Sequence, residues 1–328
     1  MKSDQSSQQS LNISSVKKLL KYLQLENKQV DYSEDASNSF SFTASDSFIK
    51  RIKKGDPADP LLLQILPQKN EMIEAVGFSY DPLDEKQALL APGLLQKYQH
   101  RVLLIATSSC GIHCRYCFRR HFPYNKEADK SLLSRQLEKN IQIIQSKTDI
   151  TEVILSGGDP FTLNDQRFGA LIEQLSHITH LKRLRIHSRQ LIIQPERITD
   201  KLVNTLREFP HPVIIVMHIN HPAEINEEVI QSLARLKQAN IQLLNQSVLL
   251  KNINDHSDIL ISLSERLCQA GILPYYLHML DAVSGSQHFM VSATKAKRII
   301  TQMKEKLPGY LVPKLVKELP DDKYKREL

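Results

Sequence analysis

The 328-residue sequence contains no tryptophan and no apolar run that approaches the ~18 residues needed to cross a membrane as a helix. Its opening stretch, MKSDQSSQQSLN, lacks the apolar core of a secretory signal peptide. We therefore expect a cytoplasmic protein without membrane attachment, whose thiols stay reduced. RNP patterns, zinc-finger spacings and aromatic stripes between basic residues are also missing. The net charge of +7 then indicates a solvated basic surface, or attraction to an acidic partner or anionic cofactor, rather than nucleic-acid binding.

Cysteine is scarce as well, and its placement is uneven. The chain has four cysteines, of which Cys110, Cys114 and Cys117 form the pattern Cys-x3-Cys-x2-Cys. In a reducing compartment such a cluster indicates a metal or redox site rather than disulfides. Three thiolates can hold three irons of a 4Fe-4S cluster and leave the fourth iron open, as a catalytic metal site requires. The alternative is a structural zinc ion with His113 or His121 as its fourth ligand.

From residue 101 onward, short β-rich apolar runs alternate with amphipathic stretches. This alternation predicts an α/β fold in which a parallel sheet is covered by helices, and right-handed crossovers can roll it into a partial, open (β/α)6 barrel. We expect residues 1–95 to form a mainly helical N-terminal extension, 96–310 the barrel, and 311–328 a short C-terminal tail over the barrel mouth. The six runs are residues 101–107, 151–158, 181–188, 213–220, 241–250 and 272–280.

Polar and reactive residues follow each of the predicted strands. Because the carboxyl ends of parallel strands meet at one rim of a barrel, we expect these groups to converge on one site. In strand order they are the cysteine motif, Gly-Gly-Asp-Pro (157–160), His-Ser-Arg (187–189), His-Ile-Asn-His-Pro (218–222), Asn-Gln-Ser (245–247) and Asp281.

Several motifs resemble those of one enzyme family. In order along the chain they are CRYCFRRHFPY, SGGDP, LRIHSR, HINHP, LLNQSVLL and PYYLHMLDAVSGSQHF. They resemble the radical S-adenosylmethionine (radical SAM) lysine 2,3-aminomutases over about residues 50 to 325. The resemblance is closest to the short bacterial branch that serves (R)-β-lysylation of elongation factor P.

The resemblance implies an isomerase that converts L-lysine to (R)-β-lysine by 2,3-amino migration. Its cofactors would be a 4Fe-4S cluster, S-adenosylmethionine (SAM) and pyridoxal 5'-phosphate (PLP). A reductant protein such as flavodoxin or ferredoxin would supply the electron, and a separate ligase would attach β-lysine to elongation factor P. The resemblance leaves a homo-oligomer open.

The resemblance also assigns cofactor contacts to individual residues. Besides the three cysteines, it implies that the Ser156–Asp159 loop contacts the methionine amino group of SAM and that His218 contacts the adenosyl group. His278 stands where many free-standing aminomutases have tyrosine, whereas the short relatives have histidine. The loop comprises Ser156, Gly157, Gly158 and Asp159, and the positions near the PLP phosphate are Arg189 and Gln246, with Ser188, Asn245 and Ser247 beside them.

Four further positions match the family's catalytic and substrate-binding residues. Lys325 would hold PLP as a Schiff base, with Lys323 as the alternative. Arg119 would bind the substrate carboxylate, for which a planar guanidinium fork is well suited. Asp281 and Glu318 would bind the ε-ammonium of lysine, and two carboxylates there would reject a neutral side chain.

Three other interpretations stay open at this level. One is a radical SAM aminomutase for another amino acid, although two carboxylates oppose glutamate. Another is a non-enzymatic iron–sulfur or zinc protein that binds an acidic partner. The third is a degenerate aminomutase, because the segment LPDDKYKREL departs from the family pattern around Lys325.

Overall fold

The computed structural model describes residues 11, 13–26, 30–124, 130–320 and 322–328. The first ten residues of the predicted N-terminal extension therefore lie outside the described part of the chain. A ten-stranded sheet forms the centre of the molecule, and its strand order follows the order along the chain. All six predicted strands are present, as β3 (Arg101–Thr107), β4 (Glu152–Gly157), β5 (Arg183–Ser188), β6 (Val213–Met217), β7 (Gln242–Val248) and β8 (Leu273–His278).

The sheet continues beyond these six strands at both edges. Strand β9 (Lys314–Lys317) pairs parallel to β8, and β10 (Arg326–Glu327) folds back antiparallel on β9. At the other edge, β1 (Leu89–Ala91) and β2 (Leu94–Leu95) form an antiparallel ribbon beside β3. The edge strands β1 and β10 do not pair with each other in the residues described, so the predicted open α/β barrel is confirmed. Strand β9 was not predicted, and it lies in the segment expected to be a tail.

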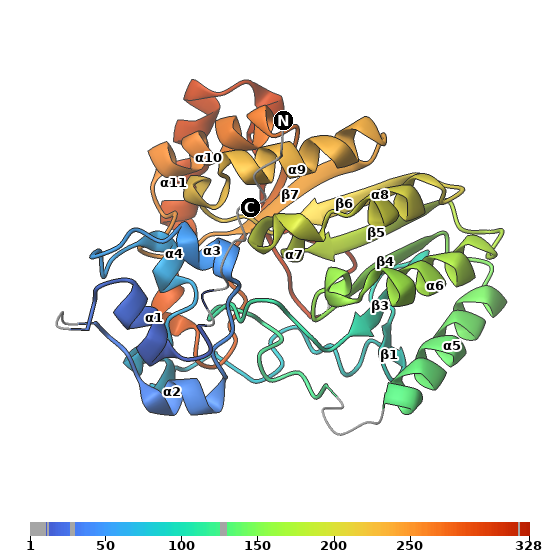
Figure 1. The fold of residues 1–328 in the computed structure, drawn as a ribbon, viewed down its shortest axis with the longest axis horizontal. Helices are drawn as coiled ribbons and strands as arrows, with labels where there is room; N and C mark the ends of the chain where they lie inside the picture. Colours follow the sequence, from blue (N-terminus) through green and yellow to red (C-terminus); the bar gives the residue numbers. More distant parts are fainter. Residues whose placement is uncertain (1–10, 12, 27–29, 125–129, 321) are drawn as a thin grey trace, which may run out of the picture.

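Amphipathic helices pack on the outer face of the curved sheet (Figure 1). Side chains at their N-caps accept hydrogen bonds from free backbone N–H groups, as with Asn164, Thr199, Asn226 and Ser292. Their apolar faces join the sheet in one continuous core. The helices are α5 (Lys130–Ser146), α6 (Asp165–Ser176), α7 (Gln190–Ile193), α8 (Asp200–Arg207), α9 (Glu227–Gln238), α10 (Ser257–Gln269) and α11 (Ala293–Lys306).

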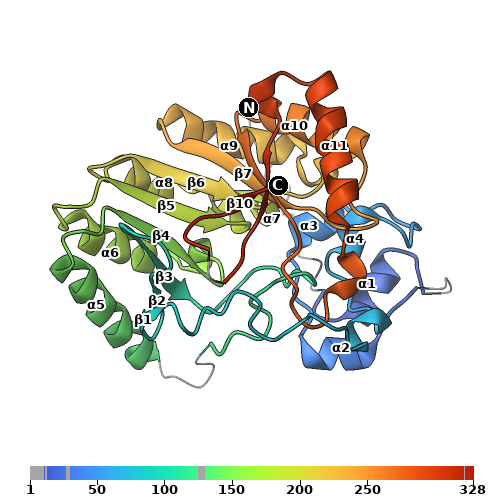
Figure 2. The same cartoon turned by 180° about the vertical axis from the view of Figure 1, so that it is seen from behind.

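The N-terminal extension has a hydrophobic core of its own, and that core also reaches the cysteine loop. Ile112 of the cysteine loop and Ile193 of α7 are both buried in it. In Figure 1 these blue helices lie beside the barrel, and in Figure 2 the dark-red C-terminal segment crosses the side that the outer helices leave open. No helix among the described residues is long and apolar enough to span a membrane. The helices of the extension are α1 (Val16–Tyr22), α2 (Glu34–Ser39), α3 (Asp46–Lys50) and α4 (Pro60–Leu63).

Candidate active site

The cysteine loop follows β3 and is anchored to the N-terminal extension. The backbone N–H of Arg115 donates to the carbonyl of Gln64 at 2.9 Å. The Arg115 side chain is fully buried, and its Nε and Nη2 donate to the two carboxylate oxygens of Glu71 at 2.9 and 2.6 Å. Such a bidentate pair fixes both distance and orientation. The extension therefore sets the path of the loop that carries the thiols.

The three thiols lie close enough to influence one another's ionisation. Burial, followed by the nearby Cys117, raises the pKa of the Cys110 thiol well above its usual range. Burial and the nearby Cys114 raise the pKa of Cys117 to about 11. Three thiolates together are therefore unfavourable unless a cation offsets their charge. Cluster iron supplies such a cation, because a coordinated thiol is deprotonated outright.

The structure gives no support to a structural zinc ion in this loop. Within the described part of the chain, no group of three or more Cys, His, Asp or Glu side chains converges on a point that could hold one metal ion. The two candidate fourth ligands have other partners: a ring nitrogen of His113 lies 2.7 Å from the carbonyl of Ser41, and one of His121 lies 3.0 Å from that of Ser284. A 4Fe-4S cluster does not need one meeting point for the three thiols, because each cysteine binds a different iron.

The Gly157–Gly158 pair lets the second strand approach the cysteine loop closely. Gly157 has a φ of +123°, and a Cβ there would lie 2.4 Å from the carbonyl oxygen of Thr107. A Cβ on Gly158 would lie 2.1 Å from the carbonyl oxygen of Ser109. Only glycine is compatible with both the conformation and the contact. The backbone N–H groups of Gly158 and Asp159 donate to these same carbonyls, so the two loops form one unit.

The Asp159 carboxylate points into the protein rather than toward an open site. It accepts hydrogen bonds from the backbone N–H of Phe161, Arg189 and Gln190 and from the Ser188 hydroxyl. Asp159 thus connects the ends of β4 and β5. The contacts predicted between SAM and the Ser156–Asp159 loop stay predictions.

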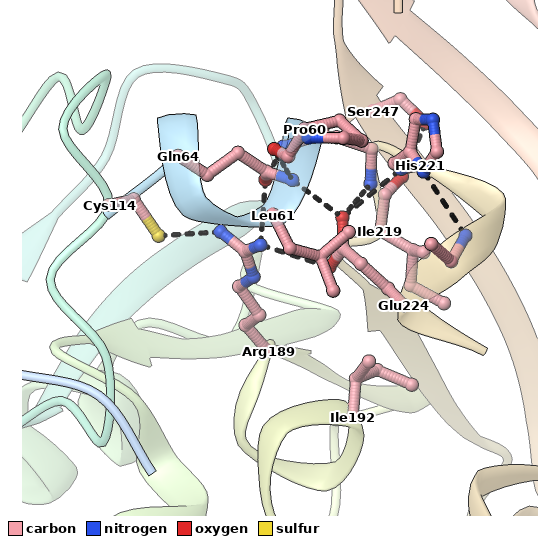
Figure 3. Close-up of polar contacts among 12 residues, drawn as sticks. Pro60, Leu61, Gln64, Cys114, Arg189, Ile192, Ile219, His221, Glu224 and Ser247 are labelled. Carbon is pink, nitrogen blue, oxygen red and sulfur yellow. Dashed lines mark hydrogen bonds and ion pairs between the residues drawn. The ribbon is translucent and has the colours of Figure 1, made fainter. Parts of the chain in front are cut away.

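Arg189 lies behind the cysteine loop (Figure 3). Its Nη1 is 2.8 Å from the Sγ of Cys114, and its Nη2 is 2.7 Å from Gln64 Oε1 and 2.9 Å from Glu224 Oε2. Nη1 also donates to the hydroxyl of Tyr116. The guanidinium is therefore engaged with protein groups around the cysteine loop. Its predicted role at the PLP phosphate gains no support from this arrangement.

Arg119 keeps a charged guanidinium at the rim of the barrel. Its Nε and Nη2 pair with both oxygens of Glu85, at 2.8 and 2.6 Å, and its Nη1 donates to Ser156 Oγ at 3.0 Å. Burial opposes the charge, but Glu85 outweighs it and raises the pKa of Arg119 above its ordinary value. Glu85 was not predicted as a site residue. Because it occupies the Nε edge, the Nη1 end is the part of Arg119 left for a substrate carboxylate.

Glu318 and Lys325 form an ion pair at the edge of the sheet. The Glu318 carboxylate accepts from Lys325 Nζ, from Lys97 Nζ at 3.1 Å and from the hydroxyl of Tyr98 at 2.9 Å. Burial alone would raise the pKa of Glu318. The positive charges of Lys325 and Lys97 together have the larger effect and lower this pKa to about 2. The side chain of Lys323, the alternative to Lys325, is exposed. Of the two lysines, Lys325 is therefore the one directed into the site.

A pocket opens beside this ion pair. Glu318 lines it together with Lys97, Tyr98 and Arg101 from the segment that leads into β3, and with Glu85. None of Lys97, Tyr98 and Arg101 was predicted. Lys97 and Tyr98 precede the first predicted strand, and their partner Glu318 is more than two hundred positions away. Arg101 is the first residue of that strand, and no polar motif marks it. Two cationic side chains beside Lys325 suit a phosphate group.

Asp281 lies at the end of β8 near the same ion pair. Its carboxylate accepts no hydrogen bond from any residue that the structure describes, and burial followed by Glu318 raises its pKa to about 7. Lys325 and Lys97 lower the pKa, but less strongly. A buried carboxylate without a partner is costly. Asp281 is therefore available for an added cation.

Neutral imidazoles line the interior between Arg119 and Lys325. Burial, together with the positive charges of Arg189, Arg119 and Lys325, lowers the pKa of His218 to about 3. Gln246 Nε2 lies 2.7 Å from His218 Nε2, so these two predicted cofactor residues are brought together. Within the described chain, the Nε2 atoms of His187 and His278 are buried without a hydrogen-bond partner. Unpaired buried nitrogens mark places where a ligand can bind.

Asn245 and Ser247 face the opposite side of β7 from Gln246. The Asn245 amide bonds to the backbone of Ile219 and to Ser247 Oγ, and Ser247 Oγ donates to the Ile219 carbonyl. Successive side chains of a strand point to opposite faces, so only Gln246 of this trio faces the interior.

An open parallel barrel with a three-cysteine loop after its first strand and a glycine loop after its second defines a radical SAM enzyme. Residues 104–263 match the family model of the Radical SAM superfamily. The L-lysine 2,3-aminomutase of Haemophilus influenzae is 44% identical over 307 residues, which cover 94% of this chain and 90% of that protein. The proteins of the same name from Buchnera aphidicola and Escherichia coli are 46% and 43% identical, over 86% and 89% of this chain and 82% and 84% of their own lengths.

The chain therefore belongs to the lysine 2,3-aminomutase family of radical SAM enzymes, as the motifs predicted. It is accordingly an enzyme of the isomerase class with aminomutase chemistry. The superfamily carries a 4Fe-4S cluster and SAM, and Cys110, Cys114 and Cys117 stay the predicted ligands of that cluster. The interpretation as a non-enzymatic metal-binding protein is excluded by this membership.

Proposed function

We propose that the protein converts L-lysine to (R)-β-lysine by 2,3-amino migration. The observation that carries this proposal is that one interior contains groups of opposite charge for the two ends of a substrate. A guanidinium, Arg119, is available for one end, and two carboxylates, Asp281 and Glu318, are available for the other. L-Lysine has the complementary pattern, with a carboxylate at one end and an ammonium at the other. Glutamate, whose far end is anionic, would meet carboxylates.

The carboxylate end of lysine would bind Arg119. Glu85 fixes the guanidinium from its Nε edge, so Nη1 is presented beside Ser156. The amide of Gln246 and the ring of His218 lie between Arg119 and the other end of the site. Because His218 is neutral, it can donate or accept a hydrogen bond without adding a charge that repels the substrate.

The ammonium end would bind Asp281 and Glu318. Glu318 already has Lys97 and Lys325 as partners, whereas Asp281 has none among the described residues. Asp281 would therefore gain most from the ammonium. A neutral side chain of the same length would leave the Asp281 carboxylate buried and unpaired, which supports lysine over norleucine-like substrates.

PLP would occupy the same interior. Lys325 would hold it covalently, Lys97 and Arg101 could neutralise its phosphate, and the unpaired Nε2 atoms of His187 and His278 could bond to it. When bound, PLP would make the amino nitrogen of lysine able to migrate between neighbouring carbons, and SAM at the open iron would supply the hydrogen-abstracting radical. The side chains around them orient the substrate and keep water out.

Three further features of the proposal come from the short bacterial branch that the chain resembles. β-Lysine would be passed to a ligase that modifies elongation factor P, a flavodoxin or ferredoxin would reduce the cluster, and the protein would act in the cytoplasm. The names of the relatives support the lysine chemistry, while these partners rest on the resemblance alone.

The test is the product formed by cluster-loaded protein under anaerobic conditions with L-lysine, SAM, PLP and dithionite. Chiral derivatisation and mass spectrometry should detect (R)-β-lysine. Lys323→Ala is a matched control that should retain activity, whereas Lys325→Ala should lose both the product and the PLP adduct trapped by borohydride. Wild-type protein with verified iron, sulfide and PLP that forms no β-lysine would overturn the proposal.

A further inference from the structure

The reaction proposed above does not use the buried guanidinium of Arg189, which lies behind Cys114. Arg189 Nη1 lies 2.8 Å from Cys114 Sγ, within hydrogen-bonding distance for sulfur. The side chain of Arg189 is only 6% exposed, and that of its partner Glu224 is 0% exposed. A charge buried this deeply next to a cluster ligand acts on that ligand with little screening by water.

Hydrogen bonds at both Nη atoms hold the guanidinium in place, whereas its buried Nε has no partner among the described residues. Glu224 and Gln64 accept from Nη2 (Figure 3). Tyr116 accepts from Nη1. Its plane also lies near two aromatic rings, with the guanidinium carbon 5.4 Å from the ring centroid of Phe48 and 5.9 Å from that of Tyr116. Arg189 therefore cannot turn away from the sulfur without breaking several of these contacts at once.

The anchors of Arg189 are themselves fixed. Glu224 Oε1 accepts from the backbone N–H of Asn220 and His221 and from the Gln64 amide, so its other oxygen is directed at Arg189. Gln64 belongs to the N-terminal extension, at the end of α4, and its Oε1 also accepts from Tyr116 and Asn220. The N-terminal extension thus takes part in placing the charge behind the cluster.

We propose that Arg189 is a positioning residue that donates an N–H···S hydrogen bond to Cys114 when that thiolate binds cluster iron, and thereby raises the reduction potential of the cluster. Reduction adds one electron, and part of its negative charge resides on the cysteine sulfurs. A fixed cationic donor stabilises the reduced cluster more than the oxidised one, and hydrogen bonds to sulfur are among the factors that set these potentials. The inference depends on the cluster and not on which amino acid is the substrate.

The experiment is a redox titration with dithionite, monitored by electron paramagnetic resonance of the reduced cluster in the absence of SAM and lysine. Replacing Arg189 alone with an apolar residue would leave Glu224 buried and unpaired, so the main variant is Arg189→Met combined with Glu224→Gln. At a fixed ambient potential, we expect the ratio of oxidised to reduced cluster in this variant to be about tenfold higher than in the wild type. This corresponds to a midpoint potential lowered by ~59 mV for one electron. Arg189→Lys, which keeps the charge but loses the planar fork, should give a smaller shift in the same direction.

Arg51 provides the matched control. It lies beside the same network and donates to the backbone carbonyls of Ile192 and Glu224, but it contacts no sulfur. Arg51→Lys should leave the midpoint potential unchanged, which separates the hydrogen bond from a general loss of packing. If the double variant fails to bind iron, Arg189→Lys decides the question. The proposal would be overturned if the cluster-loaded Arg189 variants had the same midpoint potential as the wild type. It would also be overturned if Arg51→Lys shifted the midpoint potential as much as they do.

Discussion

Replacing Asp281 with asparagine should weaken the binding of L-lysine roughly 30- to 150-fold. Truncating one partner of a buried charge pair costs about 2–5 kcal/mol. The pKa of about 7 means that the wild-type carboxyl is partly protonated at neutral pH, and the cost of ionising it reduces its gain from the ammonium. We therefore take the lower part of that range, about 2–3 kcal/mol, which gives the stated factor at ~1.4 kcal/mol per tenfold.

Calorimetric titration of anaerobic, cluster-loaded protein with L-lysine and with L-norleucine measures this effect directly. Norleucine lacks the ε-ammonium, so Asp281→Asn should weaken lysine binding and leave norleucine binding unchanged or improved. Equal losses for both ligands would show that Asp281 acts on the fold rather than on the ammonium, and the assignment would be wrong.

The same carboxyl predicts a pH dependence with a definite sign. Only ionised Asp281 attracts the ammonium, and its pKa of about 7 lies within the accessible range. Lysine binding should therefore weaken as the pH falls below 7, by up to about tenfold per pH unit. Asp281→Asn should remove this dependence, and a pH profile shared by the variant and the wild type would contradict the explanation.

Three further outcomes test other parts of the site. Cys114→Ala should leave the circular dichroism spectrum intact and abolish reductive cleavage of SAM, measured as 5′-deoxyadenosine by chromatography. Arg119→Lys should raise the dissociation constant of lysine about 10- to 100-fold, because an ammonium cannot reproduce the planar contacts, and lysine amide should show a much smaller loss. Glu318→Gln should lower the free energy of unfolding by about 3 kcal/mol at pH 7, since its pKa falls from 4.5 to about 2 in the folded protein. That contribution is nearly complete above pH ~5 and is lost as the pH falls from ~4 toward the folded pKa of about 2, so urea unfolding at pH 7 and at pH ~3 should show the difference between wild type and variant shrinking.

The barrel strands could be predicted because their signal is local. Each buried parallel strand is a short apolar run, and the runs recur with an amphipathic helix between them. In the sheet, Val102, Val153, Leu184 and Val213 lie opposite one another in one buried row. Strand β9 was missed because four residues next to a proline give too short a pattern, and only its pairing with β8 identifies it.

The rim of the barrel could be predicted, but the directions of its side chains could not. The strand-end rule placed Arg189 and Asn245 near the site, yet one points at the cysteine loop and the other at the outer helices. The roles of Lys97 and Tyr98 could not be predicted, because they depend on Glu318, a partner more than two hundred positions away. A pattern in sequence fixes which face of a strand a residue occupies only once the register of the sheet is known.

The order of the strands has a consequence for how this enzyme is assembled during synthesis. Since neighbours in the sheet are also neighbours in the chain, each β/α unit can dock on the previous one as it leaves the ribosome, and no early strand must wait for a late one to enter between them. Contacts such as that between Lys97 and Glu318 are different, because they can form only when β9 has joined the sheet. The cysteine loop is thus synthesised well before the lysine proposed to hold PLP.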